Sequence, residues 1–363
     1  MRLLRPPTTA SVRHRTAAAR RAARLEYVPM TPSSPDAEPA VPQEAGQDNH
    51  PRLRVAVRVV GIVAAVAALT LCTIALVDSW STVSTAVASA DPRWLALALL
   101  ASAASMVGLA VLWKRTLTTF GAVHPIREVS SWYFVGELGK YIPGGIWPVV
   151  GRGELAARAG VSRGLAYTST LLSLALMCVG AALASGLLAP FLAADGGRVG
   201  PEMALLVLVP IGVICAHPSV SGRMLALLDR FTKGRVRVAA PPFRTMLSLI
   251  LGAVPTWLLV GAASVAVTQA LGYEQLPARI AFAAIAAWIV GFLAVPVPAG
   301  AGIREILFVA ISGLEPGPAV AVAAIARLLL MVVDAGGGIL GLLWLRAARG
   351  PQTPTPPEGG SVE

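Results

Sequence analysis

The sequence is poor in charged residues, cysteine and histidine. Asp, Glu, Lys and Arg make up 13% of the 363 residues, about half the share usual in soluble globular domains. The three cysteines lie in apolar segments without CxxC spacing, which excludes a disulfide framework and argues against a zinc site. The four histidines are scattered. We therefore expect no metal site and no bound cofactor.

Catalytic motifs are also missing. The chain has no nucleophile elbow, no HExxH and no Walker motif, so we predict that it has no soluble catalytic domain and is not an enzyme. The stretch GGGILG at 336–341 matches GxGxxG, but it lies inside an apolar run with no preceding strand. We interpret Gly337 and Gly341 instead as positions where another helix packs closely.

Long apolar runs dominate what is present. Hydrophobic residues make up 55% of the chain, and several runs approach the roughly 20 residues that a bilayer-spanning helix needs. The fold class predicted is therefore all-α, a polytopic membrane helix bundle. Six full spans are expected, at about 58–77, 94–113, 164–193, 203–216, 246–271 and 319–345.

Basic residues lie between the apolar runs, as in cytoplasmic loops of membrane proteins. The segments 114–163 and 217–245 are the richest in Lys and Arg between spans. This pattern predicts a multi-pass protein of the cytoplasmic (plasma) membrane with both termini in the cytoplasm. It also accounts for the net charge of +11 without a nucleic-acid partner.

The ends of the chain differ from its middle. We expect three regions: a disordered cytoplasmic segment at 1–50, basic and then Pro-rich, a transmembrane domain at 51–347 and a disordered tail at 348–363. Residues 1–29 contain seven Arg and one Glu. Two interpretations stay open for them: a basic amphipathic helix on anionic lipid, or translation that starts at Met30.

Two segments interrupt the apolar pattern in the same order. KYIPGGIWPVVGRGE at 140–154 and the stretch 279–313 each combine a helix, proline, a Gly-rich turn, Arg, Glu and a second short helix. Proline breaks a helix because it lacks an N–H group. With the basic loops in the cytoplasm, the two segments enter the membrane from opposite sides. We predict two re-entrant helical hairpins in an inverted repeat, with a binding site between them; the alternative is a pair of ordinary interfacial loops.

The expected substrate site collects the residues of both breaks and two charged residues of the last span. These residues are Lys140, Pro143, Gly144, Gly145, Arg152, Glu154, Pro298, Gly300, Gly302, Arg304, Glu305, Arg327 and Asp334. The arginines of the breaks would hold a phosphate and Lys140 would guide it, while the acids would hold the arginines or a cationic headgroup. Alternatively, Glu154 pairs with Arg158 on one helix, and the last span carries only a structural ion-pair network with Arg304 or Glu305.

The stretches GKYIPGGIWPVVGRGELAARAGV and VPVPAGAGIREILF resemble the lysylphosphatidylglycerol synthase transmembrane-domain family. Members typically carry Pro-x-Pro-Gly-Gly-x-Gly-x-Arg-Glu. This chain matches that pattern at Pro296, Pro298, Gly300, Gly302, Arg304 and Glu305, and departs from it at Ala299. The resemblance covers roughly 55–345 and implies a flippase-like integral membrane protein. The best-known relatives add a soluble aminoacyl transferase domain, for which we expect no room in this chain.

The resemblance implies that the chain binds a lipid and translocates it across the bilayer. The lipid would be an aminoacylated phospholipid or a polyprenyl-phosphate-linked sugar. Two other hypotheses stay open. One is a membrane-embedded enzyme that acts on a lipid-linked substrate with Glu154 or Glu305 as its base. The other is an accessory subunit that works with envelope-biosynthesis proteins.

Overall fold

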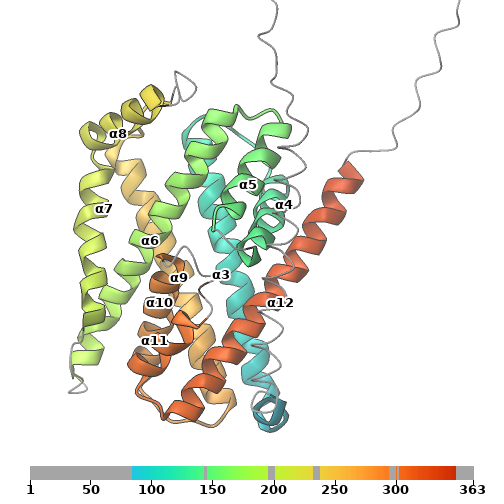
Figure 1. Cartoon of the computed structure of the whole chain (residues 1–363), viewed down its shortest axis with the longest axis vertical. Coiled ribbons are helices and arrows are strands. Elements are labelled where there is room, and N and C mark those ends of the chain that lie inside the picture. The colour runs from blue at the N-terminus through green and yellow to red at the C-terminus, as the bar shows by residue number, and fades with distance from the viewer. Residues whose placement is uncertain are drawn as a thin grey trace, which may run out of the picture. The chain divides into compact units, whose positions relative to one another are not determined.

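The computed structural model describes residues 84–142, 145–194, 201–231, 238–293, 300 and 302–348. All of them lie in one compact unit, Val55–Glu363. The elements in chain order are α3 (Pro92–Thr119), α4 (Ile126–Glu137), the 3-10 helix η1 (Leu138–Tyr141), α5 (Trp147–Arg158), α6 (Arg163–Ala194), the 3-10 helix η2 (Pro201–Val207), α7 (Leu208–Ala216), α8 (Pro218–Phe231), α9 (Phe243–Ala270), α10 (Pro277–Leu293), α11 (Ile303–Ser312) and α12 (Pro316–Ala348). The predicted all-α fold class is confirmed (Figure 1).

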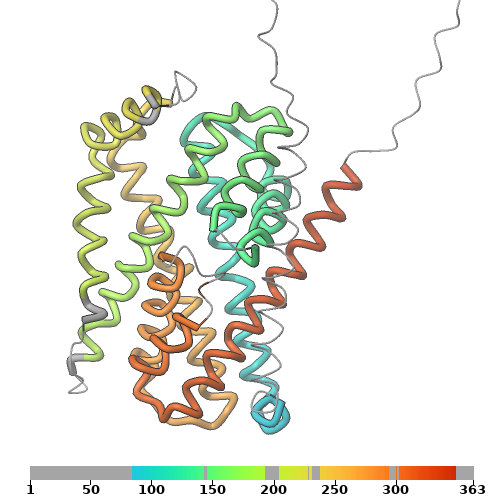
Figure 2. The backbone as a smooth tube through the Cα atoms, viewed as in Figure 1, coloured from blue at the N-terminus to red at the C-terminus, as the bar shows by residue number. Residues whose placement is uncertain are grey.

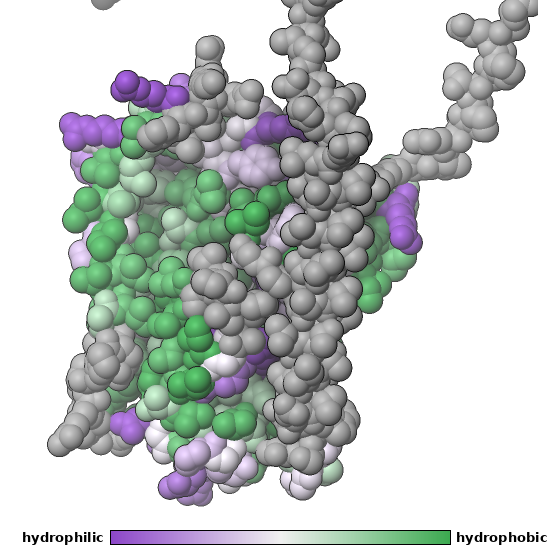
Figure 3. Space-filling view, in the orientation of Figure 1, coloured by the Kyte–Doolittle hydropathy of each residue, from purple (hydrophilic) through white to green (hydrophobic). Residues whose placement is uncertain are grey.

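Four helices are long and apolar enough to cross a membrane: α3, α6, α9 and α12. They coincide with four of the expected spans, and their bounds differ from the predicted ones by at most a few residues. α3 begins where the Asp91 side chain accepts a hydrogen bond from the Arg93 N–H at 2.8 Å, with Pro92 at the first helical position, where its missing N–H costs nothing. Side chains on the flank of the bundle are largely hydrophobic (Figure 3), as contact with lipid requires.

The span expected at 203–216 takes a different form. It is divided into η2 and α7, and the chain then bends by 82° between Ala204–Ala216 and Pro218–Leu227. The described residues therefore contain four spans, or five if this bent pair is one. The expected first span at 58–77 lies outside them, so the total of six stays a prediction.

Small residues bring the central helices together. A side chain on Gly108 of α3 would meet the Thr256 hydroxyl of α9 at 2.5 Å. A side chain on Gly261 of α9 would meet the Ala281 methyl group of α10 at 2.7 Å. Close approach of backbones at small residues is typical of helix association in membranes, because lipid tails supply no hydrophobic driving force between helices. α9 therefore lies among α3, α6 and α10 at the centre of the bundle.

Each interrupted segment forms two helices joined by a break. α4 and η1 precede the first break and α5 follows it, and α10 and α11 flank the second. The two hairpins occupy opposite ends of this unit, and the helix ends next to each break point toward its middle (Figures 1 and 2). The predicted interruptions are thus confirmed. Pro143, Gly144 and Pro298 lie outside the described residues, and the depth of the hairpins in a membrane stays a prediction.

Three glycines of GGGILG form the contact of α12 with α4 and η1. A side chain on Gly337 would collide with the ring of Phe134, and one on Gly338 would meet Leu138 at 2.7 Å. On Gly341 it would meet the Ser131 carbonyl oxygen at 3.0 Å. The interpretation of Gly337 and Gly341 as packing positions is confirmed. Their contact holds α12 against the first hairpin.

Replacing Gly337 by Leu is expected to separate α12 from α4. The matched control is Gly336→Leu, since nothing lies within 4 Å of a side chain built there. Overpacking should cost Gly337→Leu about 1–3 kcal/mol, whereas the control gains helix propensity. Thermal unfolding in detergent, followed by tryptophan fluorescence, would measure the difference. Equal midpoints for the two variants would contradict this packing.

Candidate functional site

The first hairpin contains a buried ion-pair network centred on Glu137, the last residue of α4. Its carboxylate pairs with the Arg152 guanidinium of α5 and lies 3.3 Å from the Lys140 ammonium of η1. Gly136 makes room for this arrangement, because a side chain there would meet the Arg152 side chain at 2.6 Å. Arg152 and Glu137 are only 3% and 6% exposed, so each needs the other as its counter-ion.

Asp334 joins this network from α12. Its Oδ2 atom accepts hydrogen bonds from the Lys140 ammonium at 2.7 Å and from the Tyr141 hydroxyl at 2.6 Å. The residue is completely buried. Asp334 therefore pairs with the first hairpin and not with Arg304 or Glu305. Of the two charged residues in the last span, Arg327 forms the pair with Glu305 that the ion-pair alternative expects. Lys140 lies between two carboxylates and links three elements of the fold.

Sequence reasoning missed Glu137 and Tyr141 as members of this network. A usable signal was the i,i+3 spacing of Glu137 and Lys140, which brings both side chains to one face of a helix. Tyr133, also missed, lies under the Arg152 guanidinium, 3.9 Å from it to the ring centroid. The sequence predicts Glu154, and not Glu137, as the acid that holds Arg152.

Glu154 lies away from the network. Its carboxylate is 3.7 Å from Arg158 and 3.2 Å from Arg163, and both arginine side chains are exposed. The alternative in which Glu154 pairs with Arg158 on α5 describes this geometry better than a role in the substrate site. Exposed pairs of this kind contribute little to stability.

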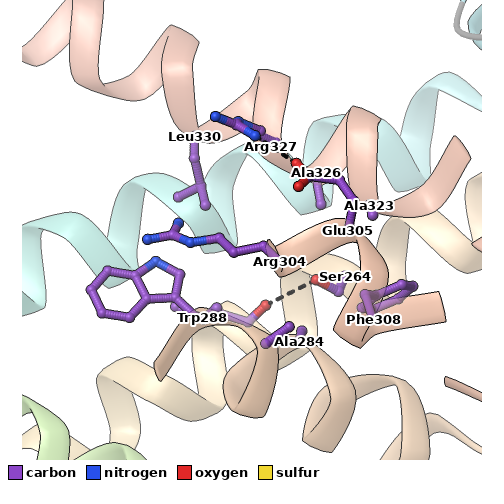
Figure 4. Close-up of a pocket in the computed structure, with 12 residues that line it drawn as sticks. Ser264, Ala284, Trp288, Arg304, Glu305, Phe308, Ala323, Ala326, Arg327 and Leu330 are labelled. Atoms are coloured by element: carbon purple, nitrogen blue, oxygen red, sulfur yellow. Dashed lines mark hydrogen bonds and ion pairs between the residues drawn. The ribbon is translucent and has the colours of Figure 1, made fainter. Parts of the chain in front are cut away.

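Arg304 of α11 is the central residue of the second hairpin. Its guanidinium lies over the Trp288 indole of α10, 4.6 Å from the ring centroid (Figure 4). Its side chain runs against Gly291, where a side chain would collide with it, and a side chain on Gly300 would meet its Nε atom at 2.8 Å. No described residue hydrogen-bonds or ion-pairs with Arg304, and its buried Nε atom lacks a partner.

Glu305 and Arg327 form a separate pair beside Arg304. Their side chains approach to 2.6 Å, as the dashed line in Figure 4 shows. The second carboxylate oxygen of Glu305 accepts the N–H of Gly302 at 2.7 Å and so fixes the start of α11. Gly302 has φ of +82°, a conformation that glycine adopts without strain. Glu305 and Arg327 line a cavity of about 70 Å³ together with Arg304 and Trp288.

The two hairpins repeat one contact. In the first hairpin, the arginine Arg152 of α5 lies over the ring of Tyr133 and against Gly136, three residues after that tyrosine. In the second, the same three parts are Trp288, Gly291 and Arg304. The residue after the glycine differs, since it is Glu137 in the first hairpin and Phe292 in the second. The second arginine therefore lacks the carboxylate that neutralises the first.

One cavity of about 160 Å³ lies between the hairpins. Among the predicted site residues, those that line it are Lys140, Gly145, Arg152, Gly300 and Arg304. Glu137 and Trp288 line it as well, together with apolar side chains that include Met177 and Phe292. The structure thus brings the two interrupted segments to a common space, and it places Asp334 next to that space through Lys140.

The described charged residues of the two hairpins and α12 leave one positive charge without a partner. Glu137 and Asp334 balance Lys140 and Arg152, and Glu305 balances Arg327. Arg304 alone among these residues has no counter-ion in the described part of the chain. A guanidinium in a confined, mostly apolar space favours an anionic oxygen ligand, which it can bind through two parallel hydrogen bonds. No group of three or more His, Cys, Asp or Glu that could hold a metal ion occurs among the described residues.

Replacing Glu137 by Gln is expected to destabilise the fold strongly. Arg152 would stay buried without a counter-ion, which costs about 3–5 kcal/mol. The matched control, Glu154→Gln, removes an exposed pairing worth at most about 1 kcal/mol. Thermal unfolding in detergent would compare them. The double variant Glu137→Leu/Arg152→Met should recover part of the loss, and a single variant as stable as the control would contradict the role of Glu137.

The comparisons with known proteins agree with this architecture. A family model described as the lysylphosphatidylglycerol synthase TM region matches residues 56–338. No curated protein matches the chain. The matched range extends from before α3 into α12 and includes both hairpins. With its apolar membrane-capable helices, this chain is therefore an integral membrane protein that belongs to the lysylphosphatidylglycerol synthase TM-region family.

Proposed function

We propose that the protein binds the anionic headgroup of a lipid between its two hairpins and moves that lipid across the cytoplasmic membrane. The observation that carries this proposal is Arg304, a buried guanidinium that lines the cavity and has no counter-ion among the described residues. A charge held in this way is costly unless a ligand neutralises it. A lipid phosphate is an anion of matching shape and charge.

The cavity walls support a lipid rather than a free anion. Apolar side chains of three helices lie beside the cationic groups, among them Val149, Met177 and Leu293. Leu293 is 52% exposed, so the cavity is bordered by a side chain that also faces the surroundings of the bundle. An amphipathic ligand could therefore place its charged end at Arg304 and its apolar part toward the membrane.

The charge balance favours a substrate with one negative charge at the phosphate, as in a phosphodiester. Arg152 contributes little free charge because Glu137 neutralises it. Lys140, between Glu137 and Asp334, orients the network rather than providing a second free cation. This assignment changes the sequence-based hypothesis, in which both arginines hold the phosphate.

We further propose that the hairpins form an inverted repeat entered from opposite sides of the membrane. The repeated aromatic–glycine–arginine contact supports this proposal. Interrupted backbone at membrane depth is tolerated where it lines a cavity inside the protein. A site between two such repeats can open to one side and then to the other. The basic loops support an orientation with both termini in the cytoplasm.

The surroundings of Glu305 and Glu154 favour transport over catalysis. Glu305 is held by Arg327 and the Gly302 N–H, and Glu154 is held by exposed arginines. Two partners therefore occupy the Glu305 carboxylate, and Glu154 does not line the cavity between the hairpins. This arrangement does not favour either residue as the base that the enzyme hypothesis requires. The hypothesis of an accessory subunit for envelope-biosynthesis proteins stays a prediction from the sequence.

Replacing Arg304 by Gln is expected to slow lipid movement at least roughly tenfold, because a hydrogen bond to a charged group contributes about 1.5–3 kcal/mol. The assay measures dithionite access to fluorescent phosphatidylglycerol in proteoliposomes. Arg346→Gln, at the exposed end of α12, is the matched control and should behave like the wild type. Arg304→Lys should retain part of the activity. Unchanged movement in Arg304→Gln proteoliposomes would overturn the proposal.

Phe292→Glu is expected to inhibit transport by giving Arg304 the counter-ion that Glu137 provides in the first hairpin. Phe292→Gln is the control of similar shape without charge, and it also removes the stacking of Phe292 on Trp288. The same vesicle assay should show a further loss, roughly tenfold, for Glu relative to Gln. Equal rates for the two variants would show that the unpaired state of Arg304 is not needed.

A further inference from the structure

A second cavity lies outside the hairpin site. It measures about 480 Å³ and is bordered by α6, α7, α8 and the start of α9. Its lining is almost entirely apolar, with Thr168 and Ser221 as its hydroxyl groups and with two free cysteines, Cys178 and Cys215. None of its lining residues belongs to either hairpin.

The cavity follows α6 for about half the thickness of a membrane. Its lining residues on α6 run from Thr168 to Val179, a distance of about 16 Å at 1.5 Å per residue. The hydrocarbon core of a bilayer is about 30 Å thick. The cavity is therefore as deep as the acyl region of one leaflet.

α8 covers one end of this cavity. It turns away from α7 by 82° and lies at the upper left of Figure 1, beside the end of α7. Ser221, Met224 and Leu225 of α8 line the cavity, while Arg223 and Arg230 are exposed and form no ion pair with a described residue. Hydrophilic colour gathers at this end above the hydrophobic flank (Figure 3). These are the features of a helix that lies in a membrane interface.

A buried hydroxyl group marks the same end. Thr168 is 4% exposed, and its Oγ1 atom has no hydrogen-bond partner in the described structure. It lies five residues after the start of α6, and it lines the cavity with Ser221 of α8. A buried hydroxyl without a partner costs free energy, so a ligand with an ester or phosphate oxygen would satisfy it.

We propose that this cavity binds one acyl chain of an anionic phospholipid whose headgroup lies at α8. The chain fills the apolar part beside Cys178, an ester oxygen reaches Thr168, and the exposed arginines attract the phosphate. A membrane helix of a partner is about 10 Å wide and 30 Å long, several times larger than the cavity. The volume instead suits a small ligand or a single chain.

The test measures phospholipid retained by the full-length protein in native mass spectrometry, after detergent exchange and addition of phosphatidylglycerol. Ala175→Phe fills the cavity from the exposed lining residue Ala175 and should lose one bound lipid. The matched control, Ala96→Phe on an exposed face of α3, should lose none. Retention by Ala175→Phe of the wild-type number of lipids would overturn the proposal.

Thiol protection gives a second readout that does not require a bulky side chain in the cavity. With Cys72 and Cys178 replaced by Ala, added phosphatidylglycerol should slow alkylation of Cys215 at least fivefold. Phosphatidylcholine should protect less, and Arg223→Gln/Arg230→Gln should remove the difference between the two lipids. Equal alkylation rates with and without phosphatidylglycerol would overturn the proposal, as would protection that depends on formation of a dimer of this chain.

The variant Arg304→Gln separates the proposed acyl-chain site from the hairpin site. This variant should keep the lipid that Ala175→Phe loses, because Arg304 does not line the second cavity. If Arg304→Gln has no effect on transport, the proposed function fails while the acyl-chain site stands. If both variants lose the same single lipid, the second cavity is not a separate site.

Discussion

The pairing of Glu137 with Arg152 and Lys140 is the interaction on which the site depends. It joins α4, η1 and α5 through buried charges, and Asp334 extends it to α12. A buried carboxylate or guanidinium is tolerated only when a partner neutralises it, so these elements cannot separate without exposing a charge to an apolar environment. The network therefore fixes the first hairpin, and the cavity takes one of its walls from this rigid unit.

The second hairpin uses the same local geometry with a different electrostatic result. Gly291 lets Arg304 lie over Trp288, just as Gly136 lets Arg152 lie over Tyr133. The carboxylate that completes the first contact has no equivalent, because Phe292 follows the second glycine. The charges of the first hairpin thus neutralise one another and stabilise the fold, whereas the second hairpin presents the unpaired charge of Arg304. We infer that this asymmetry, not the repeat alone, makes the space between them suitable for an anion.

The two cavities suit different parts of lipid molecules. The space between the hairpins combines a guanidinium with apolar walls and favours a headgroup inside the bundle. The space under α8 is almost wholly apolar and one leaflet deep, which favours an acyl chain at its edge. α6 lines both cavities, with Leu174 and Met177 toward the first and Leu171, Leu172 and Cys178 toward the second. A lipid seated under α8 would therefore contact the helix that forms a wall of the hairpin site.

The sequence by itself determined the class of protein, four long spans and both helix interruptions, because hydropathy and proline chemistry act over short distances. It also identified Gly337 and Gly341 as packing positions. Only the tertiary structure decided which charges meet. Glu137 and Asp334 are 197 residues apart in the chain, yet both contact Lys140. The unpaired state of Arg304 likewise follows from what surrounds it in space, since ion pairing depends on distances between folded elements.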